Sequence, residues 1–434
     1  MDTNTKAQSP MRRIFSIRDF RLLWAGSATS ILGDQFAFIA TPWLVLQLTH
    51  DPLVLGTVLA LEGVPRAIFI LIGGAITDRF SPRTIMLVSD IARMILTALM
   101  ALVIFTGTIQ LWMLYAFGLA FGLVAGFAIP ASNSIVPMLV AEEDLQAGNS
   151  ISMGTVQLVS FIGPTIAGIV IASYANSPMG SALAFAIDAV TFAVSALTLW
   201  LIRVARKRAE QPAGESIWTS IAAGMRYLWK ETTLRFMFIL MALSNFLVTG
   251  PLLVGIPVLA AQRLPEGAMA FGLLISAYAG GNLLGYLLSG ALPRPTGKVL
   301  TILVITLVAA FGLVFIMIGW LSKTWLDFVL MLLLGIGNGY IGLMLFTWIQ
   351  QRTPKEMLGR MMSIVMLSNI GLTPISQAVA GAVSKWTLTG LFVSTGSLIV
   401  LLALWIAAQP ALRILSQNMV DASTAAAAPE TSSD

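Results

Sequence analysis

Long apolar runs separated by short polar segments recur along the whole chain. About twelve of these runs hold 18 or more mostly apolar residues, the length that a helix needs to cross a bilayer. Helices are the expected form, because each backbone polar group then finds its partner within its own segment. The pattern predicts an all-α membrane protein with twelve transmembrane helices. The predicted spans are residues 21–47, 53–77, 84–106, 110–132, 148–172, 179–202, 234–260, 269–291, 298–319, 324–347, 360–384 and 388–408.

The composition excludes a soluble fold, and the residues that catalytic and metal sites commonly use are scarce. Apolar residues make up 57% of the 434 positions and charged residues only 10%, whereas an ordinary soluble domain has about 25% charged residues. The chain has no cysteine and a single histidine, His50, which excludes a disulfide framework and cysteine-based metal sites. The segment "GIGNGY" lacks the Lys-Ser/Thr of a P-loop. We therefore expect no enzyme activity, no cofactor, no metal and no ATP-driven pumping.

Lysine and arginine are distributed unevenly between alternate loops. With the N-terminus in the cytoplasm, twenty of the 25 basic residues fall in cytoplasmic segments, three in outside loops and two within spans. An excess of basic residues in the cytoplasmic loops sets the orientation of a membrane protein. We predict a multi-pass protein of the cytoplasmic membrane with both termini inside. The net charge of +5 then reflects contact with anionic lipid headgroups rather than nucleic acid.

A long polar connection divides the chain into two halves of six predicted spans each. A shift of 213 residues pairs Gly126 with Gly339 and Gly168 with Gly381, which indicates a duplication. Parallel repeats of this kind place a binding site near the midplane between them. We expect a monomer. Its predicted parts are a cytoplasmic N-terminal segment at 1–20, a six-helix bundle at 21–202, a cytoplasmic linker at 203–233, a second six-helix bundle at 234–408 and a disordered cytoplasmic tail at 409–434.

The segment "GGAITDRFSPR" places a compact cluster of charge between the second and third spans. Its Gly74, Asp78, Arg79 and Arg83 resemble the loop motif of the major facilitator superfamily, although the family's second glycine and a further basic residue are missing. The resemblance implies two pseudo-symmetric six-helix bundles. It also implies a latch, in which Asp78 lies at the N-terminal end of span 11, near Arg360, and closes the inner side. A loop that only fixes the membrane orientation is the alternative.

A second motif, "SFIGPTIAG", lies in span 5. Its Gly163, Pro164 and Gly168 resemble the Gly-Pro motif of exporters in this superfamily. Glycine lets helices approach closely, and Pro164 removes one helical hydrogen bond and permits a bend. These three residues are therefore predicted to form a hinge.

The connections "IPASNSIVPMLVAEEDLQAGNS" and "IQQRTPKEMLGRMMS" resemble those of the macrolide-efflux and siderophore-export branch. This resemblance implies a secondary exporter of amphipathic, macrolide- or multidrug-like compounds that works by proton antiport and alternating access. A siderophore exporter or a lysolipid transporter of the same fold is one alternative. A transport-inactive membrane scaffold or sensor is the alternative from another class.

Ionisable residues inside the predicted spans are candidates for proton coupling, because each costs at least about 2.5 kcal/mol on insertion. Asp34 lies roughly 20 Å into span 1 and Arg66 roughly 16 Å into span 2 by helix rise. We expect these two to pair, with Glu62 competing from one turn away. Protonation of Asp34, or of Glu62, would then weaken the hold on Arg66 and shift the conformational equilibrium. A static buried pair is the alternative.

Other polar residues inside the spans are less specific. Asp90 and Arg93 lie three residues apart and are expected to pair along one helix, with an inner-gate role as the alternative. Asp188 has no evident partner and is a candidate for proton coupling or for the cavity. Amide side chains near mid-span suit either contacts between helices or a cavity that hydrogen-bonds a bulky ligand. They are Gln157, Asn245, Asn282, Asn338, Asn369 and Gln377.

Overall fold

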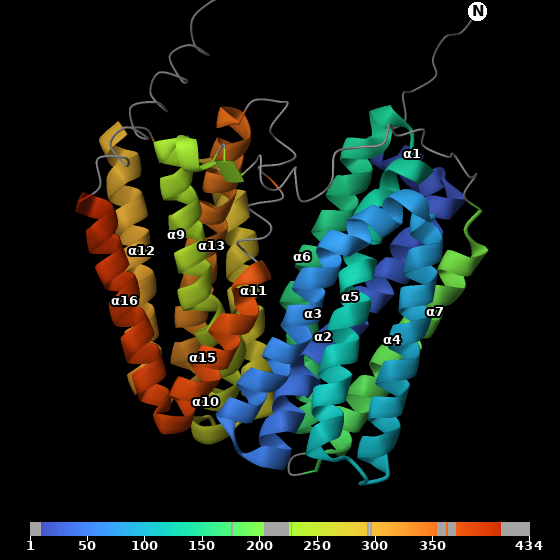
Figure 1. Ribbon diagram of the computed structural model, residues 1–434, viewed down its shortest axis with the longest axis horizontal. Helices are drawn as coiled ribbons and strands as arrows, with labels where there is room; N and C mark the ends of the chain where they lie inside the picture. The colour runs from blue at the N-terminus through green and yellow to red at the C-terminus, as the bar shows by residue number, and fades with distance from the viewer. Residues whose placement is uncertain are drawn as a thin grey trace, which may run out of the picture. The chain divides into compact units, whose positions relative to one another are not determined.

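The computed structural model describes residues 10–174, 177–203, 228–292, 297–353 and 370–408, with isolated positions at 225, 226, 295 and 362. Within these residues every regular element is a helix (Figure 1). The chain divides into two compact units, one of Met1–Gly214 with Ile256–Ala279 and the other of Glu215–Gly255 with Gly280–Asp434. The long helix α11, Ala268–Ala291, therefore begins in the first unit and ends in the second.

Eleven helices of the described part are long and apolar enough to cross a membrane. Part of the predicted span at 360–384 lies outside the described residues, and its described end is α15. The elements of the first half are α1 Pro10–Ser16, α2 Arg18–Thr49, α3 Pro52–Arg79, α4 Pro82–Phe105, α5 Leu111–Leu139, η1 Glu142–Asp144, α6 Leu145–Ala172 and α7 Met179–Leu201. Those of the second half, besides α11, are α9 Thr232–Gly250, η2 Pro251–Gly255, α10 Ile256–Arg263, α12 Gly297–Trp320, α13 Thr324–Arg352, α15 Thr373–Trp386 and α16 Leu388–Ala408.

The seventh predicted span is interrupted. A π-helical segment at Pro251–Gly255 separates α9 from α10, because Pro251 has no N–H to continue the hydrogen bonds of the helix. Ser376 of α15 compensates at the break: its hydroxyl accepts the Gly250 N–H at 2.8 Å and donates to the Phe246 carbonyl. A neighbouring helix therefore satisfies backbone groups that the interruption leaves without partners.

Glycine faces set the closest helix contacts within each unit. On α5, Gly118, Gly122 and Gly126 recur every fourth residue and lie against α3. A Cβ at Gly126 would lie 2.6 Å from Cβ of Phe69. On α13 of the second unit, a Cβ at Gly339 would overlap the Asn282 carbonyl of α11. Gly126 and Gly339, which the 213-residue shift pairs, therefore serve the same kind of helix contact in the two halves.

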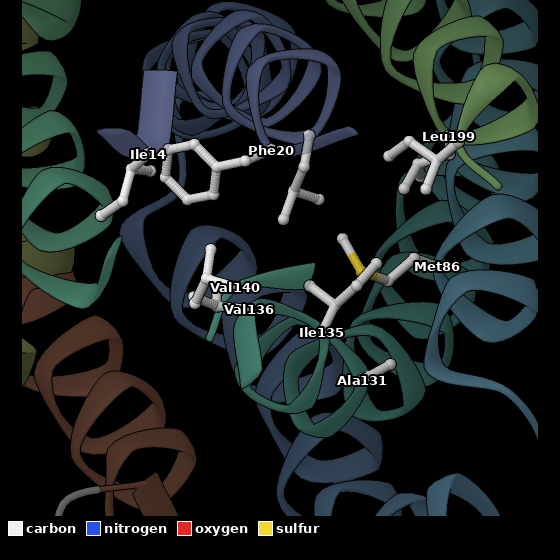
Figure 2. Packing of buried hydrophobic residues seen from close by; sticks show 10 residues of the cluster. Ile14, Phe20, Met86, Ala131, Ile135, Val136, Val140 and Leu199 are labelled. Atoms are coloured by element: carbon white, nitrogen blue, oxygen red, sulfur yellow. The ribbon is translucent and has the colours of Figure 1, made fainter. Parts of the chain in front are cut away.

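The short helix α1 packs onto one end of the first unit. Its Ile14 is fully buried in a cluster with Phe20 of α2, Met86 of α4 and Leu199 of α7, joined by α5 side chains (Figure 2). Beside this cluster, Nη2 of Arg13 lies 2.6 Å from the carboxylate of Asp144. The remaining members of the cluster are Leu23, Ala131, Ile135, Val136, Val140 and Ile202.

The Arg13–Asp144 ion pair secures α1 electrostatically. The Asp144 side chain is only 3% exposed, so a buried carboxylate here needs a cation and hydrogen-bond donors. Arg13 donates to it from both Nε and Nη2, and this hydrogen bond raises the pKa of the Arg13 guanidinium above its usual value. Arg13 therefore remains charged throughout the physiological pH range. The predicted N-terminal segment at 1–20 includes an ordered helix from Pro10 onward.

Truncation of Ile14 is expected to weaken this packing. Replacing a buried isoleucine with alanine removes apolar contacts and leaves a cavity, which costs about 2–5 kcal/mol. We expect Ile14→Ala to lower the unfolding free energy by an amount in this range. Met11, on the same helix but 58% exposed, provides the control, because Met11→Ala should change stability by less than about 0.5 kcal/mol. Thermal unfolding in detergent measures both, and equal stability of the two variants would contradict the packing of α1.

Candidate functional site

A cluster of four ionisable residues lies inside the first unit. Asp34 belongs to α2, Asp90 and Arg93 to α4, and Asp188 to α7. All except Asp90, which lies nearer the start of its helix, are in the middle part of a helix long enough to span a membrane. Because α7 packs against both α2 and α4, it brings charged groups from three helices together. We call these four residues the charge cluster.

Small residues allow α2 to approach α7 closely at this point. Gly26 and Gly33 lie one heptad apart on the same face of α2. A Cβ at Gly33 would overlap Oγ1 of Thr191 and lie 2.5 Å from Oδ1 of Asp188. Only glycine leaves room for these side chains, as in other closely packed membrane helices. The carboxylate of Asp188 is thus held against the backbone of α2, one residue before Asp34.

Arg93 is the cation of the cluster. Its Nη1 lies 3.5 Å from Oδ1 of Asp34, and its guanidinium carbon lies 5.3 Å from the ring centroid of Phe192 on α7. A guanidinium over an aromatic face is stabilised by the ring quadrupole. The Asp34 side chain is 47% exposed and the Arg93 side chain 18%. The ion pair is therefore asymmetric, with the arginine enclosed by protein and the carboxylate more open.

Asp90 is held separately by a hydroxyl group. Oγ of Ser195 donates to its Oδ2 at 2.6 Å, and both residues are buried. The predicted pairing of Asp90 with Arg93 along α4 is wrong, since Arg93 pairs with Asp34 and Asp90 with Ser195. The spacing of three residues does place both on one face of α4. That face also meets neighbouring helices, which supply the partners instead.

The predicted pairing of Asp34 with Arg66 is also wrong. Nη2 of Arg66 lies 2.9 Å from Oε1 of Glu62, four residues earlier on α3. Helix rise gives the depth of a residue in the membrane, but it does not determine where the side chain points around the helix axis. In the structure α3 packs along α5, whereas α2 packs along α7. Arg66 therefore takes the partner on its own helix, and Asp34 takes Arg93.

Asp188 is the most enclosed member of the charge cluster. It is 1% exposed, and its Oδ1 has no hydrogen-bond partner among the described residues. Thr191 donates its hydroxyl to the backbone carbonyl of Asp188 at 2.7 Å. Asp34 and Arg93 are close enough to act on Asp188 electrostatically. The structure thus places Asp188 in the same group as the two residues of the ion pair.

Several residues of the site were not singled out from the sequence. Thr191, Phe192 and Ser195 follow Asp188 on α7 at spacings of three, four and seven residues, and so share one helix face. The polar members of this face, Asp188, Thr191 and Ser195, were the signal that could have indicated it in an otherwise apolar span. Gly33 had no such signal, because its role depends on which helix lies opposite.

The hinge motif lies at a helix contact within the first unit. A Cβ at Gly168 would lie 2.7 Å from the Ala268 carbonyl, and a Cβ at Gly272 would overlap the carbonyl of Pro164, so α6 and α11 touch backbone to backbone. Next to the proline, the hydroxyl of Ser276 accepts the Thr165 N–H at 3.1 Å. Gly163 faces Gln35 of α2 instead. The motif therefore packs two helices closely, and its role as a hinge stays a prediction.

The predicted latch is only partly within the described structure. The backbone of α3 continues to Arg79, but the surroundings of Gly74, Asp78 and Arg79 lie outside the description, as does Arg360. Arg83 is described, and it donates from Nε and Nη2 to the carbonyls of Leu199 and Trp200, both at 2.7 Å. These carbonyls end α7, where a cation is favoured by the helix dipole. The latch itself stays a prediction.

The amide side chains have varied surroundings. Nδ2 of Asn338 on α13 donates to Oδ1 of Asn282 on α11 at 2.8 Å, beside the glycine contact of these helices. This hydrogen bond connects two helices in the second unit. Gln157 and Asn245 are partly exposed, and Gln377 is 4% exposed with its Oε1 unpartnered within the described residues. Asn369 lies outside the described residues.

The family model of the Major Facilitator Superfamily matches residues 23–373 of the chain. The chain belongs to this superfamily. Its fold agrees, since a D-xylose-proton symporter superposes with a TM-score of 0.69 at 12% identity, covering 89% of this chain and 96% of that one. The nucleoside transporter NupG gives a TM-score of 0.64 at 14% identity, with 89% of this chain and 97% of that one covered. The expected all-α fold with long membrane helices is thereby confirmed.

Curated relatives of similar length come from the same superfamily. The enterobactin exporter EntS of Salmonella typhimurium is 27% identical over 372 residues, which cover 83% of this chain and 84% of the relative. EntS of Escherichia coli O6:K15:H31 is 27% identical over 370 residues with the same coverage. The chain is thus a multi-pass membrane transporter of the superfamily, with siderophore exporters among its relatives.

Proposed function

We propose that this transporter exports a catecholate siderophore or a closely similar amphipathic organic molecule from the cell. The similarity to enterobactin exporters carries this proposal, because it extends over 83% of the chain and 84% of the relative and so includes both halves of the fold. It favours the siderophore alternative over the macrolide or multidrug substrate that the sequence motifs first indicated. A monomer with both termini in the cytoplasm is part of the same proposal.

We further propose that export is coupled to inward movement of protons. The support is the charge cluster, whose mid-helix carboxylates would be costly to keep in a bilayer without a function. Asp34 is more exposed than Arg93, so a proton reaching the Asp34 carboxylate would neutralise it and release the guanidinium. A change in the pairing of Arg93 alters contacts among α2, α4 and α7. It can therefore bias the equilibrium between two conformations.

Uptake into everted membrane vesicles tests this function. With the vesicle interior acidified, enterobactin should accumulate in vesicles that contain the transporter and should leak out when a protonophore is added. A macrolide and a lysophospholipid are tested in parallel. Accumulation of the macrolide or lysolipid alone would replace the proposed substrate class, and accumulation of none of the three would favour a transport-inactive membrane protein. Asp34→Asn, with normal expression, should abolish the dependence of uptake on the pH gradient.

A further inference from the structure

The carboxyl group of Asp188 takes part neither in the Arg93–Asp34 ion pair nor in the Asp90–Ser195 hydrogen bond. It is 1% exposed and its Oδ1 is unpartnered within the described part of the chain. An ionised carboxylate whose Oδ1 has no donor would keep much of its desolvation cost in such a place, because the charge of Arg93 nearby offsets only part of it. A neutral carboxylic acid would avoid most of that cost. The surroundings of Asp188 therefore favour the protonated form.

The charged groups around α7 support this assignment. Among the described helices, α2, α4 and α6 pack against α7: α2 contributes Asp34, α4 contributes Asp90 and Arg93, and α6 contains no ionisable side chain. Arg93 thus acts electrostatically on all three carboxyl groups, and Arg66 of α3 also acts on Asp34. Arg93 points to Asp34, and Ser195 donates to Asp90. Among the described residues Asp188 is the carboxyl group with no ion pair and no hydrogen bond at Oδ1, and a second negative charge next to Asp34 would be repelled.

The geometry also argues against a metal ion at this place. A hard cation such as Ca²⁺ or Mg²⁺ needs six or more converging oxygen ligands. No group of three His, Cys, Asp or Glu residues in the described structure is arranged to hold a metal. A proton requires only one carboxyl oxygen. It can therefore occupy Asp188 without any rearrangement of the helices.

We propose that Asp188 holds the proton that is exchanged during transport, and that Arg93 alternates between the carboxylates of Asp34 and Asp188. While Arg93 pairs with Asp34, Asp188 carries the proton on a carboxyl oxygen. When Asp34 takes up a proton, Arg93 is free to move to Asp188. The O–H bond of Asp188 then breaks, its proton passes to water, and the new carboxylate accepts hydrogen bonds from the guanidinium. One proton enters the cluster as another leaves, and its total charge is unchanged at the end of the step.

The position of Gly33 links the two carboxyl groups mechanically. Because no Cβ separates α2 from α7 here, Oδ1 of Asp188 lies against the α2 backbone next to Asp34. Any shift of α2 that follows protonation of Asp34 therefore changes the contact between α2 and the carboxyl group of Asp188. This coupling rests on the proposed exporter function, whereas the protonated state of Asp188 does not.

Infrared spectroscopy of the purified, substrate-free transporter tests the protonated state directly. At neutral pH the wild type should show the C=O stretch of a buried carboxylic acid, and this band should disappear as the pH is raised. Asp188→Asn, which has nearly the shape of the neutral acid, should fold normally and lack the band. Asp90→Asn is the matched control. It should retain the band, because the band is assigned to Asp188, whereas Asp90 accepts a hydrogen bond from Ser195. A band that persists in Asp188→Asn, or is absent from the wild type, would overturn the proposal.

Transport in proteoliposomes tests the role of Asp188 in coupling. A gradient of one pH unit can drive an accumulation of about tenfold when one proton is exchanged for each substrate. In Asp188→Asn, uptake of enterobactin driven by this gradient should therefore fall by about tenfold. Exchange of enterobactin without a gradient needs no net movement of protons, so it should fall by a smaller factor than gradient-driven uptake. Normal gradient-driven uptake by Asp188→Asn, or uptake driven by Na⁺ in place of protons, would refute the coupling role. If the infrared band is lost in Asp188→Asn but the wild type transports no siderophore, Asp188 is a proton site and the proposed exporter function is wrong.

Discussion

Arg93→Met is expected to abolish gradient-driven export and to destabilise the first unit. Removal of one partner from a buried ion pair costs about 3–5 kcal/mol, because the other charge is left uncompensated. Since the Asp34 side chain is 47% exposed, we expect a smaller loss of roughly 2–3 kcal/mol. Thermal unfolding in detergent measures the stability, and uptake into acidified everted vesicles measures the export.

Two further variants separate the structural and functional effects of Arg93. Arg66→Met removes an ion pair within a single helix and should cost only about 0.3–0.5 kcal/mol. The double variant Arg93→Met with Asp34→Asn removes both charges of the pair, so it should recover much of the lost stability while remaining inactive. Equal stability losses in Arg93→Met and Arg66→Met would show that Arg93 has no special structural role. Recovery of transport in the double variant would show that the ion pair is dispensable.

The second large effect is expected at the contact between α3 and α5. A Cβ at Gly122 would overlap the backbone carbonyl of Glu62, so α3 cannot accommodate it by moving a side chain alone. Overpacking of this kind costs about 1–3 kcal/mol. We expect Gly122→Ala to destabilise the transporter by this amount, although alanine favours a helix over glycine. Melting temperature and the yield of folded protein in detergent provide the measurement.

Gly154 on α6 is the matched control for this substitution. Nothing lies within 4 Å of a Cβ built at Gly154, so the same change meets no steric cost there. Alanine should then stabilise the helix by about 0.5–1 kcal/mol, the usual penalty of glycine in a helix interior. Opposite signs at the two glycines are the expected result. Stabilisation by both substitutions would mean that α3 and α5 are not in close contact.

The transmembrane character of the chain was predictable from its sequence. The run predicted at 179–202 is α7, Met179–Leu201, and the run predicted at 388–408 is α16, with the same bounds. The interruption of span 7 at Pro251 was not predicted, because the apolar run continues through it. Hydropathy measures only the cost of placing side chains in lipid. It does not show where a backbone hydrogen bond of the helix is missing. Here the Ser376 hydroxyl of another helix replaces such a bond.

The candidate site was predictable only in part. The mid-span ionisable residues Asp34, Arg93 and Asp188 were identified because charge in a bilayer is costly. Their partners were not, since helix rise gives the depth of a residue but not its direction around the axis. Asp34 was therefore assigned to Arg66 at a similar depth. The structure pairs it with Arg93, which lies on a helix that shares α7 as a neighbour.

The sequence by itself determined that this chain spans a membrane repeatedly and which residues carry charge into the apolar spans. These properties follow from local composition and from spacing along the chain. Only the tertiary structure decided that Arg93 pairs with Asp34 and that Gly33 leaves room for Asp188 at the surface of α2. Helices in lipid associate through the fit of their surfaces. That fit depends on how each helix is rotated against its neighbours, so residues far apart in the sequence decide it together.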